Sequence, residues 1–258
     1  MTLFEAHDLA INFGGVRALD GVSFAVETGH VFTIIGPNGA GKTTVFNLVS
    51  RIYEPARGRI VFRGEDITRV PPHEVARRGI ARTFQNIELF EHATLLQNLL
   101  LGRHTHRRTR FFDDLLGLPR VRSEELAHRE AAEKVIDFLD LQRYRDSLIV
   151  NLPYGIRKVV ELGRALCTEP ALLLLDEPSS GLNVEETEDM AFWIQDITRL
   201  LGITVLMVEH DMSLVSRVSD RVLALNYGRP IAHGTAKEVQ AHPEVIRAYL
   251  GTAGGGDA

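Results

Sequence analysis

The chain has 258 residues, of which 45% are hydrophobic and 24% charged, a balance typical of a globular protein rather than a disordered one. This length suits one large domain or two closely packed ones. Lys and Arg number 29 against 34 Asp and Glu, and the net charge of −5 disfavours a protein that binds nucleic acid independently of sequence. The longest aliphatic run, residues 171–175, is far shorter than the roughly 18 apolar residues that span a bilayer.

Two further features predict a protein of the cytosol. The N-terminus lacks the basic region and apolar stretch of a secretion signal. Cys167 is the single cysteine, so no internal disulfide can form, which fits a reducing compartment. We therefore expect a soluble cytosolic protein that does not itself cross a membrane.

Strand and helix patterns alternate along much of the chain. Alternating or β-branched residues predict strands at 22–26, 31–35 and 59–63, and residues 43–49 are typical of a helix. The run 31–35 is apolar throughout, as in a strand that is buried on both faces of a sheet. Strand patterns return after residue 170, at 171–175, 203–208 and 222–225.

The middle of the chain has a different texture, with helical spacing and many charges from about residue 95 to residue 141. Strands that alternate with helices predict a parallel sheet in an α/β core, so this charged middle is interpreted as a helical insertion. We expect one domain whose core comprises residues 1–85 and 161–250. The insertion is then 86–160, and residues 251–258 form a flexible tail.

A phosphate-binding loop follows the apolar strand 31–35. Residues 36–44, Gly-Pro-Asn-Gly-Ala-Gly-Lys-Thr-Thr, match the pattern G-x-x-x-x-G-K-[ST] directly before a predicted helix. Glycines let backbone N–H groups turn towards a polyphosphate, and the helix N-terminus adds a favourable dipole. Lys42 is expected to reach the β- and γ-phosphates and Thr43 to ligate Mg²⁺. The alternative is an ordinary glycine-rich turn. Such a turn does not need a strand before it and a helix after it, so the observed order favours the phosphate loop.

A pair of carboxylates ends the apolar strand that begins near residue 171. Asp176 and Glu177 follow a run of leucines, at the strand end where open α/β sheets bind ligands. Asp176 is expected to hold Mg²⁺, and Glu177 to polarise the water that attacks the γ-phosphate. Acidic pairs also occur as helix N-terminal charges, so the pair indicates a nucleotide site only in combination with the phosphate loop.

With these motifs in this order, the chain resembles the ATP-binding subunits of ABC transporters over nearly its whole length. Gln85 resembles the Q-loop glutamine, which senses Mg²⁺ and the γ-phosphate beside the surface that docks the membrane subunit. Residues 152–156, Leu-Pro-Tyr-Gly-Ile, stand where the signature L-S-G-G-Q is expected, and 180–183 resemble the D-loop. His210 resembles the switch histidine that contacts the γ-phosphate; a buried histidine held by backbone groups is the alternative.

The resemblance implies a P-loop NTPase core, with a mixed sheet and an antiparallel N-terminal β-subdomain, plus an inserted helical subdomain. Phe13 stands where the family places an aromatic residue that stacks on adenine, although core packing would also explain it. The residues that the resemblance implies for nucleotide binding are Phe13, Asn38, Gly39, Ala40, Gly41, Lys42, Thr43, Thr44, Tyr154 and Gly155. Those implied for catalysis are Lys42, Gln85, Glu177 and His210, and those for Mg²⁺ are Thr43, Gln85 and Asp176.

Departures from the family pattern indicate one branch of it. Pro153, Tyr154 and Ile156 replace signature residues, and Asn183 replaces the usual D-loop aspartate. Together with 82–86 and 246–251, these variants resemble importers of branched-chain (hydrophobic) amino acids, whose relatives carry amides, urea or aromatic acids. Pro153 lacks both the hydroxyl and the N–H of the signature serine, so we expect backbone N–H groups near Gly155 to contact the phosphate.

The resemblance also implies partners. One protomer of a head-to-tail dimer supplies the phosphate loop, and the other supplies the signature segment; the second ATP-binding subunit is a copy of this chain or a related protein. Two separately encoded membrane-spanning permease subunits would hold the dimer at the inner face of the plasma membrane. An extracytoplasmic solute-binding protein would act on the complex indirectly, and no nucleic acid is expected.

Two other functions stay open at this point. A soluble ABC ATPase that remodels a ribosomal or nucleic-acid complex usually carries two fused cassettes or a coiled-coil insertion, and neither is evident here. A regulatory module that binds ATP without turnover would not need Lys42, Glu177 and His210 together. The basic run 103–110 is interpreted as a solvated loop, with contact to anionic lipid or to the permease as the alternative. Cys167 and Trp193 are interpreted as core residues.

Overall fold

The computed structural model describes residues 1–83, 87–106 and 119–253 of the chain. The chain divides into two compact units: one comprises residues 1–82 and the chain from 171 onwards, and the other comprises 83–170. The helical insertion predicted at 86–160 lies within the second unit. That unit continues to residue 170 because its last helix, α6, runs from Tyr154 to Leu166.

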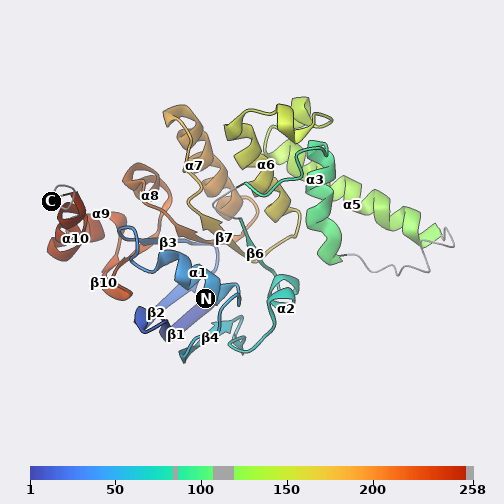
Figure 1. Cartoon of the computed structure of the whole chain (residues 1–258). Helices are drawn as coiled ribbons and strands as arrows, with labels where there is room; N and C mark the ends of the chain where they lie inside the picture. The colour runs from blue at the N-terminus through green and yellow to red at the C-terminus, as the bar shows by residue number, and fades with distance from the viewer. Residues whose placement is uncertain (84–86, 107–118, 254–258) are drawn as a thin grey trace. The chain divides into compact units, whose positions relative to one another are not determined.

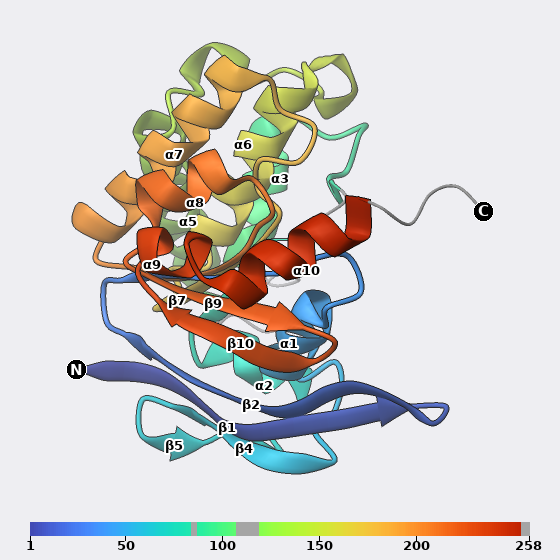
Figure 2. The ribbon, with the colours of Figure 1, turned by 90° about the vertical axis from the view of Figure 1, so that its left-hand side faces the viewer.

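An antiparallel sheet is built from the N-terminal part of the first unit. In the described part of the chain it has four strands in the order β2-β1-β4-β5, and the long β1–β2 hairpin dominates it (Figure 2). This is the antiparallel β-subdomain that the sequence predicts. The strand predicted at 22–26 is the end of a longer strand, since β2 pairs with β1 along its whole length. These strands are β1 (Thr2–Phe13), β2 (Val16–Glu27), β4 (Arg57–Phe62) and β5 (Glu65–Asp66).

A mixed sheet forms the centre of the first unit. Its described strands follow the order β10-β9-β3-β8-β7-β6; β10 is antiparallel to β9, and the other neighbours are parallel. The short edge strands β6 and β10 are absent from the sequence prediction because they carry no extended apolar run. The strands are β3 (Val31–Ile35), β6 (Ile80–Arg82), β7 (Leu172–Asp176), β8 (Thr204–Val208), β9 (Arg221–Asn226) and β10 (Arg229–Gly234).

Alternate residues of the mixed sheet serve two hydrophobic cores. Ile34, Leu174 and Leu206 face a core shared with α1 and the antiparallel sheet, whereas Ile35 and Val222 face a core made by α8, α9 and α10. Figure 2 shows these layers, with the antiparallel sheet below and the three helices above. Strands covered on both faces need apolar residues at every position, which explains the unbroken runs in the sequence. The helices of this unit are α1 (Lys42–Val49), α2 (Pro72–Arg77), α7 (Val184–Arg199), α8 (Met212–Val218), α9 (Ala236–Gln240) and α10 (Pro243–Ala253).

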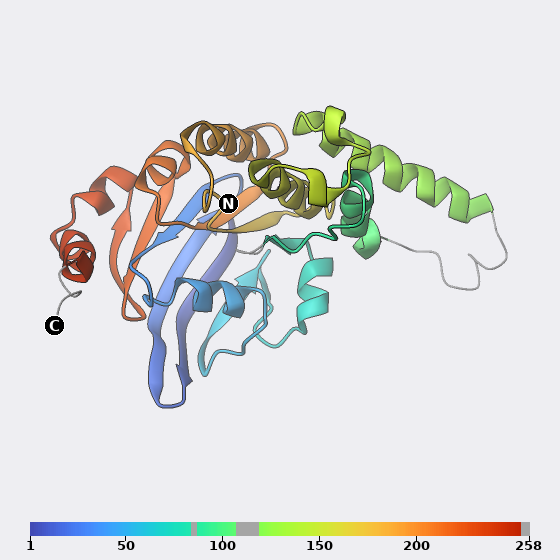
Figure 3. The ribbon, with the colours of Figure 1, turned by 45° about the horizontal axis from the view of Figure 1, so that its top comes forward.

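The second unit is helical where it is described (Figures 1 and 3). Helix α3 packs closely on α6, since a side chain at Gly163 would lie 3.0 Å from Leu99 and 3.1 Å from Leu139. Its elements are α3 (Leu95–Gly102), η1 (Arg103–His106), α5 (Pro119–Phe138), η2 (Gln142–Tyr144), η3 (Ile149–Asn151) and α6.

Two loop predictions are corrected by the structure. Arg103 is 8% exposed, and its guanidinium donates to the Cys167 carbonyl and to Glu169, so the start of the run 103–110 is anchored rather than solvated. Residues 107–110 lie outside the described residues. The tail prediction also began too early, because α10 extends to Ala253. Cys167 is buried as predicted, and Trp193 is only partly buried. Among the described helices, none is long and apolar enough to cross a membrane.

Candidate functional site

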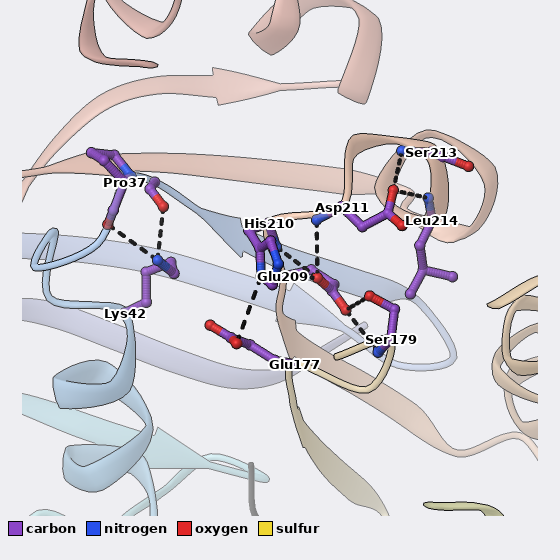
Figure 4. Close-up of polar contacts among 10 residues, drawn as sticks. Pro37, Lys42, Glu177, Ser179, Glu209, His210, Asp211, Ser213 and Leu214 are labelled. Atoms are coloured by element: carbon purple, nitrogen blue, oxygen red, sulfur yellow. Dashed lines mark hydrogen bonds and ion pairs between the residues drawn. The ribbon is translucent and has the colours of Figure 1, made fainter. Parts of the chain in front are cut away.

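The strand register explains why residues far apart in the sequence meet at one edge of the mixed sheet. Val208 of β8 pairs with Ile34 of β3 on one side and with Asp176 of β7 on the other. The three strands are parallel, so the segments that follow them leave the sheet at the same level. Those segments are the phosphate loop after β3, Glu177 directly after β7, and residues 209–211 after β8 (Figure 4).

The phosphate loop wraps around the amino group of its own lysine. Nζ of Lys42 donates to the carbonyl oxygens of Gly36 at 2.7 Å and Pro37 at 3.1 Å, and the residue is 6% exposed. Gly41 precedes α1 with a φ of +99°, and a Cβ there would lie 2.8 Å from the Ala18 carbonyl oxygen. Only glycine therefore allows the loop to enter α1 in this conformation.

Burial lowers the pKa of the Lys42 ammonium group, whereas attraction to Glu177, Asp176 and Glu209 acts in the opposite direction. The lysine is thus a buried cation close to a group of carboxylates. Such a cation is suited to meet a polyphosphate, which would add further negative charge beside it.

The remaining loop residues differ in their access to solvent. Asn38, Gly39 and Thr43 are exposed and Thr44 is partly exposed, as expected of residues that bind a ligand. Ala40 is 1% exposed, and its N–H donates to the Pro37 carbonyl oxygen at 3.1 Å. The buried Ala40 side chain is thus not available to a ligand. That its backbone contributes to nucleotide binding stays a prediction.

Glu177 and His210 lie side by side at the sheet edge. Nδ1 of His210 is 3.6 Å from a carboxylate oxygen of Glu177, and their side chains are 54% and 15% exposed. The alternative of a buried histidine is thus wrong. Glu177 has a φ of +49°, a conformation rare for a residue with a side chain, and its N–H donates to the Val208 carbonyl oxygen at 2.9 Å. Residues held in this way cluster at functional sites.

Asp176 forms a buried ion pair that the sequence analysis missed. Its Oδ2 accepts a hydrogen bond of 2.8 Å from Arg82, and the two side chains are 4% and 10% exposed. The guanidinium also donates to Asn47 at 2.8 Å and to Ser50 at 3.3 Å, and it lies over the Phe46 ring. Arg82 therefore joins the carboxylate at the end of β7 to the helix that begins at the phosphate loop.

We expect removal of Arg82 to destabilise the protein. Because Asp176 would remain as a buried charge without this cation, Arg82→Met should lower the free energy of unfolding by about 3 kcal/mol. The exposed Arg69 provides a control, and Arg69→Met should change the free energy of unfolding by no more than about 0.5 kcal/mol. Urea unfolding followed by circular dichroism measures both.

A second variant tests the cause of that loss. In Arg82→Met/Asp176→Asn the buried charge is gone, so at least half of the lost stability should return. A loss of stability below about 1 kcal/mol in the single variant, or no recovery in the double variant, would contradict a stabilising role for the ion pair.

Glu209 is the second residue that the sequence analysis missed. Its side chain is 0% exposed, and its carboxylate accepts hydrogen bonds from Ser179, His210 and Asp211. One signal was present: like Asp176, Glu209 is a carboxylate at the end of an apolar strand.

Phe13 lies at the end of β1 and is 42% exposed, so it is not a core residue. Its ring and that of Tyr53 pack in a T-shaped arrangement, with ring centroids 5.0 Å apart. An exposed aromatic ring beside a second one is suited to contact a flat base. Stacking on adenine stays a prediction.

The signature segment belongs to the second unit. Pro153 is the N-cap residue of α6, directly before the first turn of the helix; Tyr154 is exposed and Gly155 buried. No side chain caps this end, so the first N–H groups of α6 rely on other partners, and they make it suited to an anion. Gln85 and its predicted roles lie outside the described residues.

Asn183 shows why an asparagine is acceptable at the position of the usual aspartate. It is the N-cap of α7: its side chain accepts from the N–H of Glu186 at 3.0 Å, and Glu186 accepts from the N–H of Asn183 at 2.9 Å. Asparagine caps a helix as well as aspartate does, so the start of α7 is preserved.

The sequence model of the ABC transporter family matches residues 19–180, and that of the branched-chain amino acid ATP-binding cassette transporters matches 229–254. The chain is 41% identical to the high-affinity branched-chain amino acid transport ATP-binding protein BraF of Pseudomonas aeruginosa, covering 97% of this chain and 98% of that protein. It is 37% identical to the corresponding protein LivG of Escherichia coli over the same shares.

Solved structures resemble the fold closely. A cassette of an ABC transporter in its ADP conformation has a TM-score of 0.85 and 33% identity, covering 97% of this chain and 99% of that one. A nucleotide-free cassette has a TM-score of 0.84 and 33% identity, with 96% and 99% covered.

Proposed function

This chain belongs to the ABC transporter family, and we propose that it is the ATP-hydrolysing subunit of an importer for branched-chain or other hydrophobic amino acids, or for related small solutes such as amides, urea or aromatic acids. The observation that carries the proposal is that Lys42, Glu177 and His210 lie in the segments that follow three neighbouring parallel strands. The solute class is supported by the names of the relatives and by the match at 229–254.

Each residue of the site has a distinct task in hydrolysis. The phosphate loop and the N-terminus of α1 bind the triphosphate, and Lys42 exchanges its carbonyl partners for phosphate oxygens. Glu177 polarises the attacking water as a general base, and His210 contacts the γ-phosphate beside it. The distance of 3.6 Å between these two side chains lets them act on one water molecule and one phosphate together.

The Asp176 carboxylate and the Thr43 hydroxyl would hold Mg²⁺ together with Gln85. The donors fit this ion, since Mg²⁺ prefers oxygen ligands. When bound with ATP, Mg²⁺ offsets the charge of the β- and γ-phosphate oxygens. The Arg82 ion pair holds one oxygen of Asp176, which limits the orientations that its carboxylate can adopt.

The partners follow from the proposed role. A second ATP-binding subunit, either a copy of this chain or a related one, presents its Tyr154 and Gly155 to the bound nucleotide. Two membrane-spanning permease subunits dock the dimer at the inner face of the plasma membrane, and an extracytoplasmic solute-binding protein delivers the solute. Closure of the dimer around ATP, and its opening after hydrolysis, would drive transport.

The proposal is tested by purification with its permease subunits and by uptake measurements. The chain should co-purify with membrane-spanning permease subunits, and the complex should hydrolyse ATP faster when the loaded solute-binding protein is added. Uptake of labelled leucine, acetamide, urea and benzoate then identifies the solute. Co-purification with ribosomes or nucleic acid, without any permease, would instead support a soluble remodelling ATPase.

Gly155 tests the proposed contribution of the second subunit. Gly155→Asp should abolish ATP-dependent dimerisation and turnover, because it places a negative charge beside the triphosphate bound by the partner. An acidic residue in the first turn of α6 interacts favourably with the helix dipole, which offsets part of the cost of placing a carboxylate at this buried position. Analytical ultracentrifugation with and without ATP, and thermal unfolding, measure the two effects separately.

Pro153→Ser is the matched control for that variant. It restores a hydroxyl at the N-cap, so turnover should be retained, and the closed dimer should gain at most one hydrogen bond to a charged group, about 1.5–3 kcal/mol. ATP-dependent dimerisation of Gly155→Asp at the level of the parent protein would remove residues 152–156 from the nucleotide interface.

A further inference from the structure

Glu209 is a fully buried carboxylate that joins two segments of the site. Its Oε1 accepts hydrogen bonds from the N–H of Ser179 at 2.9 Å and from the Ser179 hydroxyl at 2.6 Å. Its Oε2 accepts from the N–H of His210 at 2.7 Å and from that of Asp211 at 3.0 Å. Each oxygen thus serves a different segment, one after β7 and the other after β8 (Figure 4).

A carboxylate at 0% exposure is stable only when its oxygens are well satisfied. Here every hydrogen bond just described comes from an N–H or O–H group, and the buried Lys42 ammonium group adds attraction. Glutamine has nearly the same shape, but its amide would turn an N–H₂ group towards one of the two sets of donors. The arrangement therefore requires an acceptor at both ends, which only a carboxylate provides.

The two joined segments carry the proposed chemistry. Ser179 lies in a turn that begins at Glu177, whose carbonyl oxygen accepts from the N–H of Ser180 at 3.1 Å. The same turn continues through Leu182, whose N–H donates to the Ser179 carbonyl oxygen at 3.0 Å, to the helix cap at Asn183. On the other side, the His210 side chain projects outwards to Glu177.

We propose that Glu209 is a positioning residue that locks segment 177–183 to segment 209–211, so that Glu177 and His210 face the γ-phosphate as one rigid unit. This inference rests on the proposed function. It further implies that a displacement of His210 is transmitted through Glu209 to Ser179, and from there to the start of α7. Nucleotide affinity, which comes from the phosphate loop, does not depend on this lock.

The expected effect is a loss of turnover rather than of binding. In Glu209→Gln, one segment loses its acceptor and Glu177 and His210 no longer hold a common position. Since a misplacement of about 1 Å can cost on the order of a hundredfold in rate, kcat should fall about 30- to 100-fold, with the KM for ATP within about twofold. Hydrogen exchange should accelerate in both 177–183 and 209–213.

Two further variants make the test specific. Ser179→Ala removes one donor and leaves the carboxylate in place, so exchange should accelerate in 209–211 although the substitution lies in the other segment. Asp220→Asn is the matched control: its carboxylate accepts from the N–H of Val31 at 2.8 Å, at the opposite end of the same sheet. It should leave kcat and the exchange of both site segments unchanged.

The outcomes separate this inference from the proposed function. If the parent protein and Asp220→Asn do not hydrolyse ATP, the proposed function fails, while the exchange measurements still decide whether the lock exists. If Glu209→Gln keeps its kcat within about twofold of the parent value, whether or not its KM for ATP rises, the positioning role is overturned. Should Glu209→Gln fail to fold, Ser179→Ala decides, and unchanged exchange in 209–211 overturns the inference.

Discussion

Replacing Glu177 with glutamine is expected to reduce ATP turnover at least about a hundredfold while nucleotide affinity stays near that of the parent protein. Glu177 follows the last residue of β7, is 15% exposed, and lies 3.6 Å from His210. It takes no part in the phosphate loop, so its carboxylate adds nothing to the binding of the triphosphate. Glutamine keeps the size of the side chain and removes its ability to accept a proton from water.

The same variant is expected to accumulate as a dimer with ATP, because closure persists when hydrolysis does not follow. Equilibrium binding of a fluorescent nucleotide, ATPase rates and gel filtration measure the three properties on one preparation. Glu188→Gln on the exposed face of α7 serves as a control, with turnover unchanged. Turnover of Glu177→Gln close to that of the parent protein would remove this residue from the chemistry.

Lys42→Ala is expected to weaken nucleotide binding, which Glu177→Gln leaves intact. The side chain is the buried cation of the phosphate loop, and a single charged contact to phosphate contributes about 1.5–3 kcal/mol. Loss of more than one such contact should weaken ATP affinity at least about 30-fold, and turnover should fall because substrate no longer binds.

This lysine also supports the loop in the absence of nucleotide. Its amino group bonds the carbonyl oxygens of Gly36 and Pro37, so Lys42→Ala should lower the midpoint of thermal unfolding as well. The exposed Lys237 of α9 provides the control, and Lys237→Ala should change neither property. Nucleotide affinity within about twofold of the parent value would contradict the proposed phosphate contact.

Several features of this protein could be predicted from local sequence alone. The phosphate loop, its preceding strand and its following helix depend on residues within 31–49, and all three lie where the pattern predicts them. The same holds for β7 and for the carboxylates Asp176 and Glu177, because an unbroken apolar run followed by acidic residues is a local property. The order of these motifs was enough to identify the family.

Tertiary structure decided which of these residues meet and what holds them. In the sequence, Arg82 looks like a surface charge, and Glu209 is marked only by its place after an apolar strand. Both side chains are enclosed because β6 lies beside β7 and β8 lies between β3 and β7. A buried charge is stable only beside its partners, and those partners come from distant segments: Asp176 for Arg82, and Ser179 for Glu209. Sheet order is set by long-range packing, so no local pattern reveals these pairs.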